Sequence, residues 1–297
     1  MKAVSGDTNP HSPDLHRAEA RNAAALPPSV PAPRLLGAYD DGTWVALTFE
    51  DVAGRQPHVP WREGELRRVL DAVGELSRAL TLSPLDAPPA ATALADTFDG
   101  WRQLLDGDAD TGFPGGLPTD LPARLGPWTA THLPRLAELA APWPEAVTGD
   151  TLAHADLRAD NILLTGDTGD TGDTGDTGDT GDTGDTGENG DSGDHDDRAV
   201  FVDWPHAVRA APWFDLLVML PCVRAQGGPD PEELFTAHPL GRAADPDAVT
   251  AALAGLAGFF LRHSLLPTPP GIPTLRAFQR AQGDVALAWL RQRLTWS

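Results

Sequence analysis

Apolar residues form short runs within the first sixty residues and recur mainly at intervals of three and four afterwards. The runs PRLLGAY and TWVALTFE are short and apolar and flank the turn signal Asp40-Asp41-Gly42, which predicts two strands joined by a turn. A helix-like stretch over 14–26 precedes them and ends at two prolines. From Trp61 onward apolar residues recur at intervals of three and four, which predicts helices over 62–81, 91–106, 120–140, 213–226, 245–264 and 273–293.

Two further apolar runs flank a repetitive segment. NILL at 161–164 and AVFVD at 199–203 are rich in branched apolar residues, so each is predicted to be a buried strand. Between them the triplet Gly-Asp-Thr repeats seven times from Gly166 and then decays to Asp197. Because this segment has nothing apolar to bury, we predict a disordered acidic loop over 166–197 at the tip of a hairpin. A metal-binding or partner-binding role for the repeat is the alternative.

The order of these elements predicts an α+β fold with two lobes. Residues 1–54 would form a small β-containing N-lobe, and residues 55–297 a larger and mainly helical C-lobe into which 166–197 is inserted. A chain of 297 residues is long enough for either one large domain or two such lobes.

Charge and composition exclude several classes of protein. The net charge is −21, but residues 166–197 hold twelve acidic groups and no Lys or Arg, so the rest carries −21 + 12 = −9. Nucleic acid requires clustered basic side chains, which argues against such a partner. The single cysteine excludes an internal disulfide, the first residues lack the apolar stretch expected of a signal peptide, and no apolar run reaches membrane length. We expect a cytoplasmic protein away from membranes, as a monomer or weak dimer.

The segment HADLRADN at 154–161 carries the candidate chemistry. His154, Asp156 and Asn161 have the spacing H-x-D-x-x-x-x-N, which the catalytic loop of protein kinases also has. The loop leads into the strand NILL, and the following strand ends in Asp203. This order of loop and strands predicts that two metal-binding side chains, Asn161 and Asp203, meet at one edge.

Phosphoryl transfer needs few groups, and each has a candidate in this sequence. Asp156 would accept the proton of the attacking hydroxyl, and Asn161 and Asp203 supply the hard oxygen ligands that Mg²⁺ prefers. A cation must hold the phosphates of ATP; the chain has a single lysine, Lys2, and Glu19 on the first predicted helix would orient it. The sequence therefore predicts ATP and Mg²⁺ as cofactors.

With these residues the chain resembles the aminoglycoside phosphotransferase, or phosphotransferase enzyme, family of the kinase-like superfamily, which is related to the choline kinases. The pattern runs through a lysine strand, a helix glutamate, a hinge at 48–54, HADLRADN and VDW at 202–204. The resemblance implies a two-lobed protein-kinase-like fold. It also implies that Asp215 in PWFDLLVML braces the catalytic loop and that the hinge offers its backbone to adenine at Phe49, Glu50, Asp51 and Val52. We expect His154 to support this loop structurally through hydrogen bonds, with a role as proton shuttle as the alternative.

The printed sequence departs from the family pattern at its beginning. In the family, two strands and a phosphate-covering loop precede the lysine strand, whereas this sequence starts at Lys2 itself, which implies a truncated N-lobe. Either a start codon lies upstream in the same reading frame or the lobe is shortened. We expect the former, and weak binding of Mg-ATP by the chain as printed.

The function predicted from these residues is ATP- and Mg-dependent transfer of the γ-phosphate to a hydroxyl of a small-molecule acceptor, with Asp156 as the base. An aminoglycoside, another amino alcohol or a sugar is compatible with the pattern, and residues 269–283 are expected to help shape the acceptor site. One alternative is a catalytically silent binding protein that kept the fold. The other is that the acidic repeat is the functional part on a passive carrier.

Overall fold

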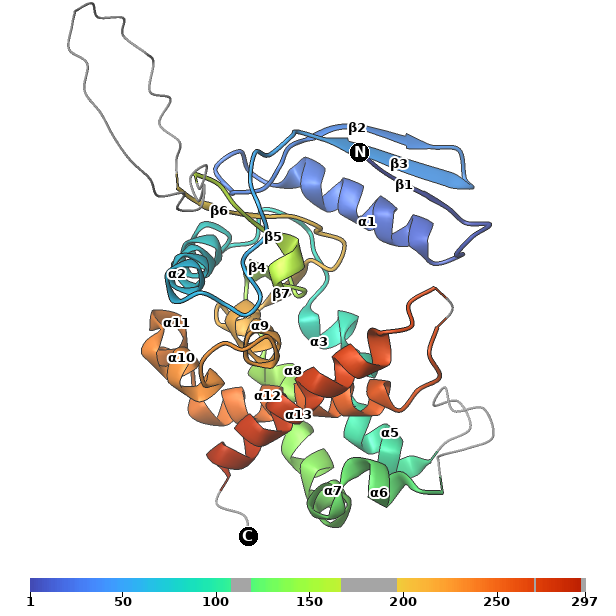
Figure 1. Ribbon diagram of the computed structural model, residues 1–297, viewed down its shortest axis with the longest axis vertical. Coiled ribbons are helices and arrows are strands. Elements are labelled where there is room, and N and C mark those ends of the chain that lie inside the picture. The colour runs from blue at the N-terminus through green and yellow to red at the C-terminus, as the bar shows by residue number, and fades with distance from the viewer. Residues whose placement is uncertain (108–118, 167–196, 270, 295–297) are drawn as a thin grey trace, which may run out of the picture.

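The computed structural model describes residues 1–107, 119–166, 197–269 and 271–294. The disorder predicted for the acidic repeat falls almost entirely on residues outside these ranges. Figure 1 shows a small sheet with one helix at one end of the molecule, and the remaining helices gathered at the other end.

The small sheet holds three antiparallel strands in the order β1-β3-β2. They are β1 (Lys2–Ser5), β2 (Leu35–Asp40) and β3 (Trp44–Phe49), and Lys2 lies opposite Leu47. Val45 and Leu47 alternate with more exposed residues and are buried, so β3 has one apolar face. Helix α1 (Ser12–Ala25) lies beside this sheet and ends two residues before Pro27 (Figure 1). The predicted strands and helix of this region are confirmed.

Two short ribbons carry the candidate loop. β5 (Ile162–Leu164) pairs with β6 (Ala199–Phe201), which confirms the predicted hairpin, and β4 (Thr151–Ala153) pairs with β7 (Val208–Ala210), which the sequence did not reveal. A 3₁₀ turn over Ala159–Asn161 leads into β5. The candidate loop thus runs from the end of β4 to the start of β5.

Four of the predicted long helices are continuous in the structure. They are α2 (Glu63–Ala79), α9 (Phe214–Ala225), α12 (Pro246–Ser264) and α13 (Leu275–Arg293). The described residues also form three short helices that the periodicity did not indicate, namely α8 (Trp143–Ala146), α10 (Pro231–Ala237) and α11 (Pro239–Arg242).

Two predicted helices are wrong as single elements. The stretch 120–140 is divided into α6 (Leu121–Leu125) and α7 (Pro127–Ala140), because Gly126 adopts a positive φ of 84° and Pro127 starts the next helix. The stretch 91–106 is divided into α3 (Ala90–Ala93), α4 (Ala95–Phe98) and α5 (Gly100–Asp106). At Gly100, the first residue of α5, the backbone approaches α12 so closely that a Cβ would overlap the carbonyl oxygen of Gly258.

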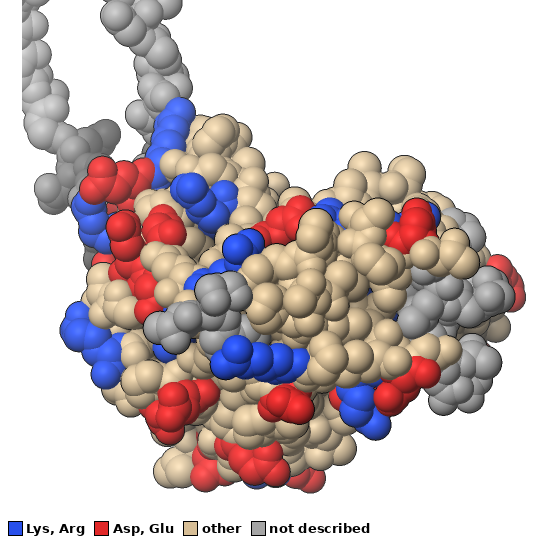
Figure 2. Space-filling view, turned by 90° about the horizontal axis from the view of Figure 1, so that it is seen from below, with Lys and Arg blue, Asp and Glu red and all other residues tan. Residues whose placement is uncertain are grey.

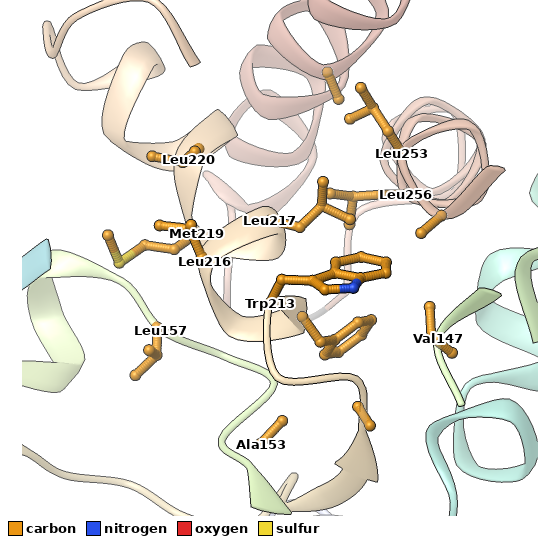
Figure 3. Close-up of a cluster of buried hydrophobic side chains, with 14 of the residues drawn as sticks. Val147, Ala153, Leu157, Trp213, Leu216, Leu217, Met219, Leu220, Leu253 and Leu256 are labelled. Atoms are coloured by element: carbon orange, nitrogen blue, oxygen red, sulfur yellow. The ribbon is translucent and has the colours of Figure 1, made fainter. Parts of the chain in front are cut away.

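The core of the helical lobe is built around α9. Leu216, Leu217, Met219 and Leu220 are fully buried, and Figure 3 shows the Trp213 indole between Leu217 and Val147. Because α9 is apolar on all sides, it is enclosed by its neighbours and held firmly. The single buried carboxylate in its first turn belongs to Asp215.

The outer surface of this lobe carries charges of both signs. Figure 2 shows Lys and Arg side chains interspersed with Asp and Glu over the face seen from below. Among the described helices, none combines the length and the apolar character that crossing a membrane requires.

Candidate active site

His154 joins the candidate loop to the end of the β5–β6 hairpin. Its ring is fully buried, and its Nδ1 atom accepts a hydrogen bond from the backbone N–H of Asp156 at 3.3 Å. The proton therefore lies on Nε2, which donates to the carbonyl oxygen of Val202 at 2.9 Å. Burial lowers the pKa of His154 to about 4, so the imidazole is neutral. Both ring nitrogens are engaged within the protein.

Asp215 holds the first turn of the loop. Its two carboxylate oxygens accept the backbone N–H groups of His154 and Ala155, each at 2.8 Å. Ala155 has a φ of 63°, a left-handed conformation that an alanine rarely adopts. Burial raises the pKa of Asp215 to about 6, against the opposing effect of these two hydrogen bonds. The carboxylate thus fixes a strained backbone at the residue before Asp156.

Asp156 and Asn161 are in direct contact. The Asn161 side-chain amide donates to the backbone carbonyl of Asp156 at 2.8 Å and to its carboxylate at 3.3 Å. Burial raises the pKa of Asp156, with the Arg158 charge opposing it from 3.4 Å. One-third of the Asp156 side chain remains exposed. It is therefore an accessible carboxylate with a raised basicity.

Three distant positions converge on a second cluster. The Lys2 ammonium lies 2.7 Å from a carboxylate oxygen of Glu19 and 2.8 Å from one of Asp203. Burial acts to lower the pKa of Lys2, but the hydrogen bonds to both carboxylates outweigh it and the pKa is raised. β1, α1 and the segment after β6 thus place a charged lysine between two acidic side chains. The sequence predicted each of these residues, and the structure brings them together.

The donor atoms of Asn161 and Asp203 suit a hard divalent cation. The N–H of Val202 donates to the backbone carbonyl of Asn161 at 3.0 Å, which holds the two residues on neighbouring strand ends. The amide nitrogen of Asn161 is engaged with Asp156, so its side-chain oxygen remains as a ligand. Within the described ranges no three His, Cys, Asp or Glu side chains gather into a metal site. The two oxygen donors of Asn161 and Asp203 are of the kind that Mg²⁺ binds together with phosphate and water oxygens.

The four hinge residues follow β3. The Phe49 ring lies beneath the Lys2 ammonium, 5.6 Å from it, whereas the N–H of Glu50 donates to the carbonyl of Arg34 at 2.9 Å. Asp51 is exposed and Val52 half-buried. Glu50, Asp51 and Val52 line a cavity of about 430 Å³ whose walls do not include Lys2, Glu19 or Asp203. The structure thus places Phe49 at the lysine cluster and the other three residues beside a separate hollow.

A cavity of about 330 Å³ opens beside Asp156. Besides the loop, α4, α9, α12 and α13 line it, with Leu275, Phe278, Gln279 and Gln282 from within the region 269–283. The sequence did not identify His206, Phe259 or Phe260, which also line it, because apolar residues on α12 indicate only a buried helix face. His206 directly follows VDWP, and this position near Asp203 was the one sequence feature that could have indicated that it lies at the site.

The sequence profile of the phosphotransferase enzyme family matches residues 8–172. This match covers more than half of the 297 residues. The chain belongs to the phosphotransferase enzyme family. The resemblance predicted from the residues is confirmed.

Two curated relatives of the family align with part of the chain. The aminoglycoside 3'-phosphotransferase of Streptomyces ribosidificus is 30% identical over 139 residues, which are 47% of this chain and 49% of that protein. That of Streptomyces fradiae is 32% identical over 142 residues, 47% of this chain and 48% of that protein. The chain thus matches about half the length of these relatives.

Solved structures of aminoglycoside phosphotransferase APH(4)-Ia show the fold. A thermostable mutant in ternary complex with AMP-PNP and hygromycin B aligns with a TM-score of 0.54 at 14% identity, covering 94% of this chain and 82% of that chain. A ternary complex with ADP and hygromycin B gives a TM-score of 0.51 over 96% of this chain and 84% of that chain, also at 14% identity. The predicted α+β, two-lobed kinase-like fold is confirmed.

The buried histidine of this phosphotransferase-family chain predicts acid sensitivity. His154 has a pKa near 4 when folded, against 6.5 ordinarily, so between these values the unfolded chain binds more protons. The contribution of His154 to the free energy of unfolding should therefore fall as the pH drops from about 6.5 to about 4, by a total of about 3 kcal/mol. Urea unfolding of the wild type and His154→Gln across this window measures it. Equal pH slopes of the unfolding free energy for the two proteins would contradict the burial of a neutral ring. Asp215, whose titration changes stability in the opposite direction, is present in both proteins and cancels in the comparison.

Proposed function

We propose that this phosphotransferase-family chain is a small-molecule kinase that moves the γ-phosphate of ATP to a hydroxyl. The observation that carries the proposal is the backbone of Val202, whose N–H meets Asn161 and whose carbonyl meets His154. These hydrogen bonds connect the loop that carries Asp156 to the end of β6, which Asp203 follows. Asp203 in turn binds the Lys2 ammonium. The relatives named aminoglycoside 3'-phosphotransferases and the APH(4)-Ia complexes with ADP or AMP-PNP support this reading.

The nucleotide side of the site consists of Lys2, Glu19, Asn161 and Asp203. Lys2 would hold the α- and β-phosphates, and Glu19, 3% exposed, would keep its ammonium in place. The side-chain oxygens of Asn161 and Asp203 would hold Mg²⁺, which neutralises charge on the phosphate oxygens when bound. We further propose that the backbone of the hinge, Phe49 to Val52, receives adenine through groups other than the N–H of Glu50, which donates to Arg34, and that the two lobes divide at residues 54–55.

The acceptor side of the site is Asp156 and the adjoining cavity. The acceptor oxygen would form a bond to the γ-phosphorus while the bond from that phosphorus to the β–γ bridging oxygen breaks, and its electron pair leaves with ADP. The hydroxyl proton would go to the Asp156 carboxylate, whose raised pKa favours this transfer. Transfer is direct, without a phosphoenzyme. A reducing, ATP-supplied cytoplasm is the compartment that this reaction and the lone Cys222 suit best.

The experiment is a transfer assay with radiolabelled ATP and a panel of hydroxylated small molecules. We expect label to move to at least one acceptor, to stop when a chelator removes the divalent cation, and to resume when excess Mg²⁺ is added. A protein that binds nucleotide and acceptor yet transfers no label to any of them would be a silent binding protein, and the kinase proposal would fail.

The acidic repeat provides a separate prediction, because its ends are adjacent. Thr165 N–H donates to the carbonyl of Arg198 at 3.0 Å, and a Cβ on Gly166 would touch Asp197, so a short turn can join these positions. We expect replacement of residues 167–196 by Asn-Gly to change kcat by less than about twofold, since none of the proposed site residues lies within them. A large loss of turnover in this variant would instead assign the function to the repeat.

A further inference from the structure

The cavity beside Asp156 has an aromatic wall. Phe98 and Phe259 stack with ring centroids 6.4 Å apart, and Phe259 and Phe260 lie 4.7 Å apart. Phe278 of α13 forms a further part of the lining. With a volume of about 330 Å³, the cavity is at the small end of ligand sites, and its size suits a compound of one or two rings. With Phe214, the lining holds five phenylalanine side chains, which favour an apolar or aromatic ligand body.

The charges around this cavity do not favour a polycation. In the lining that the structure describes, Asp156 is the one carboxylate, and Arg158 lies 3.4 Å from it. Behind the wall, Arg276 donates to the side-chain oxygen of Gln279 at 2.8 Å, and burial together with the charge of Arg276 lowers the pKa of Arg262. Ligands with several ammonium groups are held where carboxylates gather. Within the described lining a single carboxylate, that of Asp156, faces a ligand, and it is already paired with Arg158.

Two further polar side chains of the lining, Gln282 and Arg158, affect which ligands the cavity can bind. Gln282 is 3% exposed and, within the described part of the chain, its side chain makes no hydrogen bond, so its amide is available to a ligand in the cavity. The Arg158 guanidinium lies 5.5 Å from the centre of the Phe278 ring, so a cationic ligand at this ring would meet a like charge, whereas a neutral ring would not.

We propose, on the basis of the kinase function above, that the acceptor is an uncharged hydroxyl compound with an aromatic or other apolar ring body. Its ring lies against Phe259 and Phe278, its reacting hydroxyl meets Asp156, and a second polar group meets Gln282. Aminoglycosides, with several ammonium groups, are poor ligands of this cavity.

Equilibrium binding without nucleotide tests this directly. Calorimetry would compare phenyl β-D-glucoside as the neutral aromatic probe with hygromycin B as the polycation and choline as the small cation. We expect phenyl β-D-glucoside to bind at least about tenfold more tightly than either cation. Tighter binding of hygromycin B or choline, or no binding of the glucoside, would overturn the proposal.

Two substitutions locate the binding in the cavity. Phe278→Ala is expected to weaken the glucoside about tenfold, whereas Ile272→Ala, at a 50% exposed residue of the same region outside the lining, leaves it unchanged. If Phe278→Ala lowers the melting temperature strongly, Phe278→Leu gives the same comparison in a fuller core. Gln282→Glu adds a carboxylate and is expected to tighten hygromycin B. Unchanged affinities in both Phe278 variants would show that the glucoside binds elsewhere.

Different experimental results would disprove the proposed acceptor class and the proposed kinase function. Binding of the glucoside without phosphate transfer to any tested acceptor would end the kinase proposal but leave the ligand preference of the cavity intact. Transfer to hygromycin B by a protein that does not bind the glucoside would uphold the kinase function and end the inference about the acceptor.

Discussion

Replacing Asp156 with Asn is expected to lower kcat about a thousandfold while leaving the affinity for ATP nearly unchanged. The amide keeps the shape of the side chain and its contact with Asn161, but it cannot accept the hydroxyl proton, and general-base catalysis is commonly worth factors of this size. In the wild type, activity should also fall on the acid side with an apparent pKa above the ordinary value of 3.8, because burial raises the pKa of Asp156. Steady-state kinetics and nucleotide calorimetry measure these effects.

Asp160 offers a matched control for that substitution. It lies in the same loop, its side chain is 57% exposed, and it pairs with Arg158 at 3.2 Å. Asp160→Asn removes the same charge from the same loop and is expected to change kcat by less than about threefold, since exposed ion pairs contribute little. Equal losses in the two variants would show that the charge of the loop, and not the proton acceptor, sets the rate.

The second large effect is expected at Asp215. Asp215→Ala leaves the buried N–H groups of His154 and Ala155 without their acceptor, and we expect the free energy of unfolding to fall by about 3 kcal/mol. Because the loop that carries Asp156 is then free to move, kcat should fall about a hundredfold, with a smaller change in KM. Denaturant unfolding and steady-state kinetics together measure this positioning role.

A second substitution separates positioning from general loss of stability. Ala155 occupies a left-handed conformation at a φ of 63°, which glycine adopts without strain. We expect Ala155→Gly to restore part of the kcat that Asp215→Ala loses, because the loop then returns to its conformation at lower cost. A variant of Asp215 that is fully folded, with unaltered kcat, would contradict the role proposed for this carboxylate.

The positions of the candidate loop residues could be predicted from the sequence because they lie in a short segment with fixed spacing. HADLRADN directly precedes β5, and Asp203 lies just after β6. The apolar runs that predict these strands therefore also predict where the polar residues lie relative to them. Lys2 and Glu19 required the family resemblance, since a lysine near the N-terminus and a glutamate among alanines have no local signature.

The acceptor cavity and the helix breaks were not predictable in the same way. Phe259 and Phe278 belong to α12 and α13, which are separate in the sequence, and only tertiary packing shows that their rings face one cavity rather than the core. The break at Gly126-Pro127 did have a local signal, because a glycine followed by a proline ends one helix and starts another. The close approach of Gly100 to Gly258 joins residues far apart in the sequence, so no local pattern reveals it.

Phosphorus NMR of the protein with Mg-ATP and the tightest-binding hydroxylated probe tests the central claim most directly. We predict that the γ-phosphate signal declines, that ADP and a phosphomonoester of the probe appear in equal amounts, and that Asp156→Asn abolishes both changes. ATP that stays intact with the acceptor bound, or ADP that appears with inorganic phosphate and no phosphomonoester, would contradict the account.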